Sequence, residues 1–180
     1  MTVPFDSSDL ERRARSGDPG AFGSLIRAWD HDLRGVAWSV VRSDTATDDV
    51  MQDAYERAFR SLDRFDGRAT MKTWLHSIVY RTAIDHLRYE GRRRHDDVED
   101  LRPVAGTDAR AAPEATAIGR QELATVLEDC TPDQRAMLML TAGLGYSFDE
   151  TAEILGENRG TVASRVSRAR SRLTRWEEDR

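Results

Sequence analysis

The stretch that decides the fold is SFDETAEILGENRGTVASRVSRARSRLTRW, residues 147–176. Its second half repeats apolar residues at steps of four and three, which predicts an amphipathic helix with one buried edge. The apolar residues are Val162, Val166, Ala169, Leu173 and Trp176, and arginines precede the last four of them, at Arg165, Arg168, Arg172 and Arg175. Like charges at this spacing repel in an isolated helix, whereas a phosphate backbone stabilises such a row. The row therefore indicates a polyanionic partner, with a solvated basic face as the alternative.

The first half of the stretch predicts a short helix followed by a tight turn. Ser147 with Glu150 is a capping box, and Gly156 suits a left-handed residue at the helix end. Asn158 can cap the arginine-rich helix that follows. The inward edge is expected at Phe148, Ala152 and Leu155. Two helices joined by a short turn, the second of them basic, form a helix-turn-helix, which favours DNA binding over a solvated tail.

The rest of the chain predicts an all-α protein with two small helical domains. Hydrophobic periodicity predicts helices at residues 9–16, from Pro19, at 47–62, at 70–94, at 116–129 and after the cap formed by Thr131, Pro132 and Gln134. Residues 95–115 contain Pro103, Gly106 and several acids without periodicity, which predicts a flexible acidic linker. We therefore expect one domain at 1–94, the linker at 95–115 and a second domain at 116–180.

The charge of the chain is unevenly distributed. The net charge of −5 includes six arginines and no acid between residues 159 and 175, while the linker is acidic. No stretch approaches the roughly 20 apolar residues of a membrane span, and the N-terminus lacks the apolar core of a signal peptide. We expect a cytoplasmic protein without membrane insertion. The single cysteine, Cys130, excludes an internal disulfide and is expected to pack as a small apolar residue.

Two other classes of function can be weighed on the same residues. An enzyme is disfavoured because the histidines stand singly, without a metal-binding spacing, and because the chain has no glycine-rich phosphate loop. No catalytic residue, metal site or cofactor is therefore expected. A stand-alone regulator would combine the helix-turn-helix with an N-terminal sensor pocket, which Trp29, Trp38 and Trp74 could line. Core packing is the favoured role for these tryptophans, and for Leu75 as well.

Two stretches together resemble a known family. DDVMQDAYERAFRSLDRFDGRATMKTWLHSIVYRTAIDHLR, residues 48–88, resembles region 2 of the extracytoplasmic-function sigma factors of bacterial RNA polymerase. TPDQRAMLMLTAGLGYSFDETAEILGENRGTVASRVSRARSRL, residues 131–173, is similar to their region 4. The resemblance implies a dissociable initiation subunit whose partners are core RNA polymerase, promoter DNA and an anti-sigma factor. It also implies that the linker follows the RNA-exit path of the polymerase, although a simple solubilising tether explains its charge equally well.

The resemblance assigns roles to residues of region 2. A polar face at i, i+3, i+4 and i+7, which alone would be an ordinary solvated face, is expected to contact the polymerase through Asp49, Gln52, Asp53 and Glu56. The minus-ten element is expected at the loop and the following helix, on Asp66, Gly67, Arg68, Lys72, Arg81, Asp85 and Arg88. The loop would receive an unstacked base, although Asp66 and Gly67 would also suit a plain turn. Arg81 stands where the family often has asparagine, so the resemblance does not fix the minus-ten base preference, whereas affinity for the DNA backbone is expected to be kept.

Region 4 is expected to read the minus-thirty-five element with the first turns of its arginine-rich helix. The residues that match the family's reading surface are Arg159, Thr161, Ser164, Arg165 and Arg168, and Arg172 is expected to contact phosphate further along the helix. Arginine can pair with guanine through two hydrogen bonds. Ala163 replaces a frequent lysine of the family, and Arg159 is expected to restore part of the lost phosphate contact.

Overall fold

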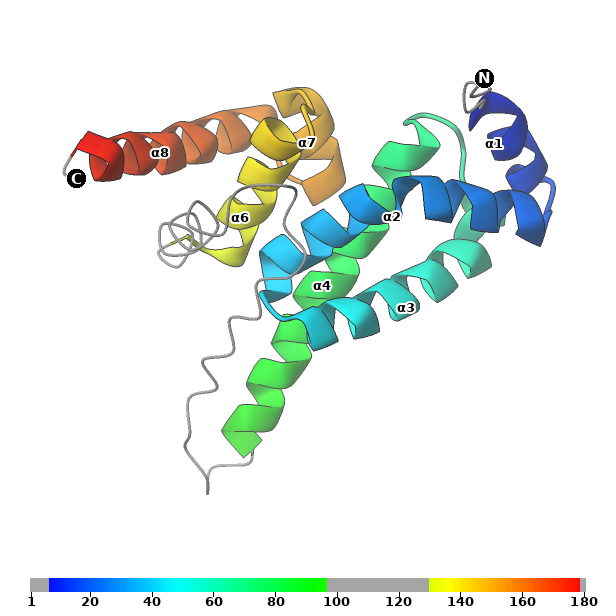
Figure 1. The fold of residues 1–180 in the computed structure, drawn as a ribbon, viewed down its shortest axis with the longest axis horizontal. Helices are drawn as coiled ribbons and strands as arrows, with labels where there is room; N and C mark the ends of the chain where they lie inside the picture. The colour runs from blue at the N-terminus through cyan, green and yellow to red at the C-terminus, as the bar shows by residue number, and fades with distance from the viewer. Residues whose placement is uncertain (1–6, 97–129, 179–180) are drawn as a thin grey trace.

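The computed structural model describes residues 7–96 and 130–178, with side chains described at 7–93 and 130–171. Over these ranges the chain is helical and contains no strand, which confirms the predicted all-α class. The N-terminal half consists of α1 (Ser7–Arg15), α2 (Pro19–Val41), α3 (Asp44–Ser61), the 3₁₀ turn η1 (Leu62–Arg64) and α4 (Met71–Asp96). The C-terminal half consists of α6 (Pro132–Leu138), the π-helical turn η2 (Met139–Gly143), α7 (Phe148–Leu155) and α8 (Arg159–Glu178) (Figure 1).

Helix boundaries in the N-terminal half follow from local capping. The side chain of Asp18 accepts hydrogen bonds from the backbone of Gly20 and Ala21, so α2 begins at Pro19 as predicted. Helix α3 begins three residues earlier than predicted, at Asp44 rather than residue 47. The reason is that Ser43 acts as its N-cap and accepts from the backbone N–H of Ala46 at 3.3 Å.

The core of the N-terminal half lies between α2, α3 and α4, with α1 packed across the start of α2. The completely enclosed side chains include Leu25, Leu33, Val36, Val50, Ala58 and Leu75, whereas Ile26, Trp29, Trp74, Ile78 and Leu87 are only partly buried against them. Helix α4 is the long central helix against which both α2 and α3 pack (Figure 1). Its length brings residues of the loop before it and of its later turns onto one continuous surface.

The C-terminal half confirms the predicted helix-turn-helix. Capping boxes start α6 at Thr131 with Gln134 and α7 at Ser147 with Glu150. Gly156 ends α7 in the left-handed conformation with φ of 70°, and the Asn158 side chain accepts from the backbone of Thr161 at 2.8 Å. The inward stripe contains Val162, Val166 and Ala169 as predicted, together with Thr151 and Ile154, which were not among the predicted inward residues. The side chains of Leu173 and Trp176 lie outside the described residues.

The two halves pack directly against each other. Helix α6 and turn η2 contact α2, and α7 contacts α4, so that one hydrophobic core runs through both halves. Figure 1 shows α6 and α7 beside the middle of the N-terminal bundle, while α8 extends away from it. Cys130 is buried, as predicted. Helix α4 continues to Asp96, two residues into the predicted linker at 95–115. The rest of that linker and the predicted helix at 116–129 lie outside the described residues, so the domain boundaries stay a prediction.

Candidate nucleic-acid interface

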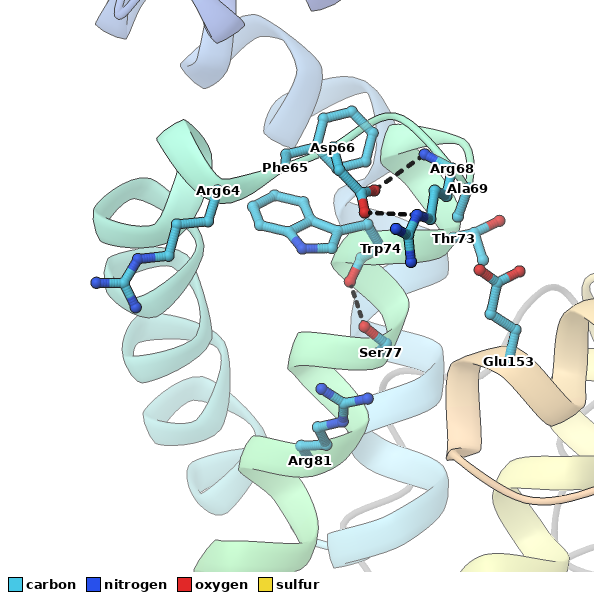
Figure 2. A pocket seen from close by; sticks show the side chains of 10 residues that line it. All are labelled: Arg64, Phe65, Asp66, Arg68, Ala69, Thr73, Trp74, Ser77, Arg81 and Glu153. Atoms are coloured by element: carbon cyan, nitrogen blue, oxygen red, sulfur yellow. Dashed lines mark hydrogen bonds and ion pairs between the residues drawn. The ribbon is translucent and has the colours of Figure 1, made fainter.

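A pocket opens on one face of α4, below the loop that precedes this helix. Its volume is about 280 Å³. The residues around it are Arg64, Phe65, Asp66, Arg68, Ala69, Thr73, Trp74, Ser77, Arg81 and Glu153 (Figure 2). All of them come from η1, the loop and α4 except Glu153, which extends from α7 toward Thr73. The loop predicted to receive a base therefore does border a cavity.

The loop is held in shape by its own side chains. Gly67 has φ of 76°, in the region that favours glycine, and Asp66 accepts from the backbone N–H of Arg68 at 3.0 Å. The Arg68 guanidinium lies 3.1 Å from the other oxygen of Asp66, yet its side chain is 89% exposed. An ion pair this exposed contributes little to stability. The guanidinium of Arg68 can therefore leave the Asp66 carboxylate and bind a phosphate group instead.

An aromatic wall closes one side of the pocket. Trp74 packs on Phe65 with ring centroids 5.2 Å apart. The guanidinium of Arg15 from α1 lies over the Phe65 ring, 5.5 Å from its centroid. Leu75 is buried as predicted, whereas Trp74 is only half-buried and faces the pocket as well as the core. Trp74 was predicted to serve the core alone, but it also lines the pocket. A flat ring beside a base-sized cavity is a stacking platform, because every nucleobase has an apolar face.

The structure separates the other predicted minus-ten residues into two groups. Arg81 lines the pocket, and Asp85 and Arg88 lie exposed on the following turns of α4, where Asp85 is 3.2 Å from Arg57 of α3. Lys72 instead points to α2, where its ammonium lies 2.5 Å from Asp32. The predicted phosphate contact of Lys72 therefore requires this half-buried pair to open.

The pocket residues that sequence reasoning missed include Thr73 and Ser77. Ser77 lies four residues before Arg81, and Trp74 lies seven before it, so the three share one helical face. From that spacing, Ser77 and Trp74 could have been predicted to lie on the same face of the helix as Arg81. Glu153 could not have been found in this way, because only the packing of α7 on α4 brings it there.

The predicted polymerase-binding face on α3 is exposed along its whole length. Asp49, Gln52, Asp53 and Glu56 all face solvent, and Glu56 pairs with Arg60 on the same helix at 3.0 Å. In the described part of the chain, Asp49 and Asp53 form no ion pair. The face is therefore available to a basic partner.

The first turns of α8 carry the predicted minus-thirty-five residues on both sides of the buried stripe. Arg159, Ser164 and Arg168 are exposed, and Arg159 lies 3.4 Å from Asp149 of α7. Thr161 is half-buried, and its hydroxyl and backbone N–H both donate to the side-chain oxygen of Asn158. Arg165 is also half-buried, 3.3 Å from Glu157. The side chain of Arg172 lies outside the described residues.

Other kinds of site find no support in the described residues. Within 7–96 and 130–178, no group of three or more histidines, cysteines or acids is placed to hold a metal ion. No helix in the same ranges is long and apolar enough to cross a membrane. The tryptophans do not converge on a sensor pocket either: Trp38 packs under Arg42 at 4.2 Å, whereas Trp74 packs on Phe65.

Fold and site together define a two-domain, all-helical DNA-binding protein, with a base-sized pocket in one domain and a helix-turn-helix in the other. Residues 25–93 match the family described as Sigma-70 region 2, and residues 120–173 match Sigma-70, region 4. The chain is 37% identical to the ECF RNA polymerase sigma factor SigM of Mycobacterium tuberculosis, over 94% of this chain and 85% of that protein. It is 31% identical to the ECF RNA polymerase sigma-E factor of Escherichia coli, over 96% and 95%.

Two solved structures resemble the whole arrangement. CnrH in complex with the cytosolic domain of CnrY has a TM-score of 0.71 at 26% identity, covering 97% of this chain and 99% of that chain. The sigma factor RpoE in complex with the anti-sigma factor NepR from Bartonella quintana has a TM-score of 0.71 at 26% identity, covering 87% and 96%. The chain belongs to the extracytoplasmic-function (ECF) RNA polymerase sigma factors of the sigma-70 family.

Proposed function

We propose that this chain binds core RNA polymerase in the cytoplasm through the exposed face of α3 and directs it to a dedicated set of promoters. The observation that carries the proposal is the pocket on α4, which combines an aromatic wall with arginines in a cavity suited to one base. A base must leave the stack to enter such a cavity, so the pocket suits the melted strand of an open promoter complex. The protein acts by binding and positioning, without a chemical step of its own.

The second DNA contact is assigned to α8. Its arginines lie on the helix that follows the turn of a helix-turn-helix, which is the helix that enters the major groove in such motifs. Arg165 is the proposed reader of a guanine edge, and Arg159 and Arg168 are proposed phosphate contacts. Two separate DNA surfaces on one small chain support promoter recognition better than they support a single operator contact.

An anti-sigma factor is the proposed regulator. The two structural relatives described above were solved with a bound partner, and one of these partners is named as an anti-sigma factor. Free basic surfaces on a sigma factor would otherwise bind DNA throughout the genome.

Run-off transcription tests the proposed function. Purified chain added to core polymerase from the same source is expected to yield transcripts from some genomic promoters, whereas core polymerase alone should yield none of them. Co-elution of the chain with core polymerase separates this function from that of a stand-alone regulator. Absence of both co-elution and promoter-dependent transcripts would favour the regulator.

A further inference from the structure

A second cavity lies between α1 and the loop at 65–70, next to the pocket on α4. Its volume is about 320 Å³, and its lining includes Arg12 and Arg15 from α1 and Phe65, Gly67 and Ala69 from the loop. Phe65 and Ala69 line the pocket on α4 as well. The loop is therefore a wall shared by two cavities, so its position depends on what contacts it from either side.

Successive residues of the loop face different cavities. Asp66 and Arg68 line the pocket on α4, whereas Gly67 lines the second cavity. A Cβ built on Gly67 would lie 3.5 Å from Nη1 of Arg15. The guanidinium of Arg15 therefore lies against the loop at its glycine, on the side away from Asp66 and Arg68.

The same guanidinium contacts the ring that supports the aromatic wall. It lies over Phe65 at 5.5 Å from the ring centroid, and Phe65 packs on Trp74 at 5.2 Å. A cation is attracted to an aromatic face, and the planar guanidinium suits such stacking. Trp74 lines the pocket on α4 and Arg15 lines the second cavity, so Phe65 joins Arg15 to the surface on which a base would stack.

Helix α1 presents Arg15 from a fixed position. Ala14 is completely enclosed, and Arg13 donates from Nε and Nη2 to one oxygen of Asp18 at 3.0 and 2.7 Å. The other oxygen of Asp18 caps α2, so this carboxylate joins the two helices. Within the described part of the chain, Arg15 itself forms no ion pair. Its guanidinium is therefore committed to the loop rather than to an acid.

We propose that Arg15 is a positioning residue for base recognition. Through Phe65 and Gly67 it holds the loop at 65–70 in the shape that receives one base, and so it sets how strictly that base is selected. The inference rests on the proposed function of the pocket. A loop that adopts several shapes holds the preferred base in only a fraction of the molecules, which lowers its apparent affinity. Arg15 acts on the loop and not on the base, since it does not line the pocket on α4.

Transcription from a promoter library tests this role. The full chain, reconstituted with core polymerase, transcribes barcoded templates in which the positions of the minus-ten element are randomised one at a time. The wild type is expected to prefer one base at the position that enters the pocket. Arg15→Ala should reduce that preference about two- to fivefold, which is the equivalent of one exposed cation–π contact, and should leave the preferences at the other positions unchanged.

Three further variants separate the contact from its charge. Arg15→Lys keeps a cation near Phe65 and should restore part of the preference. Arg12→Ala removes the same charge from the same helix and the same cavity, and should leave every preference unchanged. In a Phe65→Leu background, Arg15→Ala should have little further effect, because two residues that act through one contact are not additive.

Each remaining outcome decides against the proposal. If Arg15→Ala lowers transcription uniformly, or not at all, and the preference at every position is kept, Arg15 does not position the loop, while the proposed function stands. An equal loss of preference in Arg12→Ala assigns the effect to the charge of α1 and also overturns the role of Arg15. If the wild type gives no promoter-dependent transcripts, or shows no base preference in the minus-ten element, the proposed function of the pocket fails, and this inference with it.

Discussion

At the scale of single residues, the arginines of α8 differ in their surroundings. Arg165 is half-buried beside Glu157, whereas Arg168 is exposed and bonds only to the carbonyl of Ser164 among the described contacts. A side chain with restricted freedom, close to the start of a recognition helix, is better suited to read a base edge than to follow the phosphate backbone.

Arg165→Ala is therefore expected to weaken discrimination of the minus-thirty-five element by about 1–3 kcal/mol. Arg172→Ala should weaken binding to all sequences alike and reduce the salt dependence, because Arg172 lies two turns further along the helix. Competition between specific and scrambled duplexes measures both effects. Equal losses on both duplexes for both variants would contradict the assignment of Arg165.

His76 shows how burial sets a protonation state in this chain. The side chain is fully buried on α4, and burial is the main reason that the pKa of His76 is lowered to about 4. Its Nδ1 lies 2.8 Å from the carbonyl of Lys72, which can only accept, so Nδ1 carries the ring proton. The ring also meets Tyr146 edge-on at 5.3 Å, with the charges of Lys72 and Asp32 nearby. The neutral ring is therefore part of the packed interface.

The free energy of unfolding should fall as the pH is lowered from about 6.5 towards 4. In this range His76 becomes protonated in the unfolded chain but stays neutral in the folded chain, which favours unfolding. The full effect is at most about 3 kcal/mol. Urea unfolding across this pH window measures it. His76→Gln cannot titrate, so its stability should depend less on pH over the upper part of the window, where carboxylates remain ionised. An unchanged slope in this variant would assign the effect to other groups.

At the scale of elements, α3 uses its two faces for different purposes. One face buries Val50, Met51, Ala54 and Ala58 against α2 and α4, while the opposite face presents acids to solvent. Asp49 and Asp53 form no ion pair among the described residues, and like charges at this spacing repel each other on a helix. A basic partner would relieve this repulsion. This is the physical reason to assign the polymerase contact to this face.

Alanine at both Asp49 and Asp53 is expected to weaken binding to core polymerase by ~1 kcal/mol for each charge, mainly through slower association. Helicity should not fall, because alanine favours helix more than aspartate does. A double alanine variant at Asp63 and Glu11 makes the same change in charge outside α3 and serves as the control. If both double variants bind polymerase equally well, the α3 face is not the contact surface.

At the scale of the whole molecule, the two halves form one packed arrangement. The packed arrangement resembles solved structures of sigma factors bound to other proteins. A partner that contacts both halves at once would stabilise this arrangement further, since binding to one state shifts the equilibrium towards it.

A pull-down of the tagged chain from its native cells is expected to recover a stoichiometric protein that is not a polymerase subunit. Arg135→Ala should recover less of that protein and more core polymerase, because it removes the hydrogen bonds from Arg135 of α6 to the carbonyls of Ser39 and Val40 and so loosens the packing of the two halves. Arg27→Ala removes the same charge from an exposed site on α2 and is the matched control. Recovery of core polymerase alone under every growth condition would contradict regulation by an anti-sigma factor and would point to control by expression.

The sequence by itself determined the elements and the class of the protein. Capping residues such as Ser147, Thr131 and Asn158 act on backbone groups only a few residues away, so their effects can be predicted without the fold. Apolar periodicity likewise predicted the buried stripe of α8 at Val162, Val166 and Ala169. The two motifs, in their order along the chain, were sufficient to predict a sigma factor.

The tertiary structure alone decided how distant residues combine. The pairing of Lys72 with Asp32, the bonds of Arg135 to the end of α2 and the position of Glu153 at the pocket all join segments far apart in the chain. No periodicity encodes such pairs, because they depend on the angle and register at which whole helices pack. The pocket was therefore predictable as a loop and a helix face, whereas its acidic rim depends on how the two domains pack.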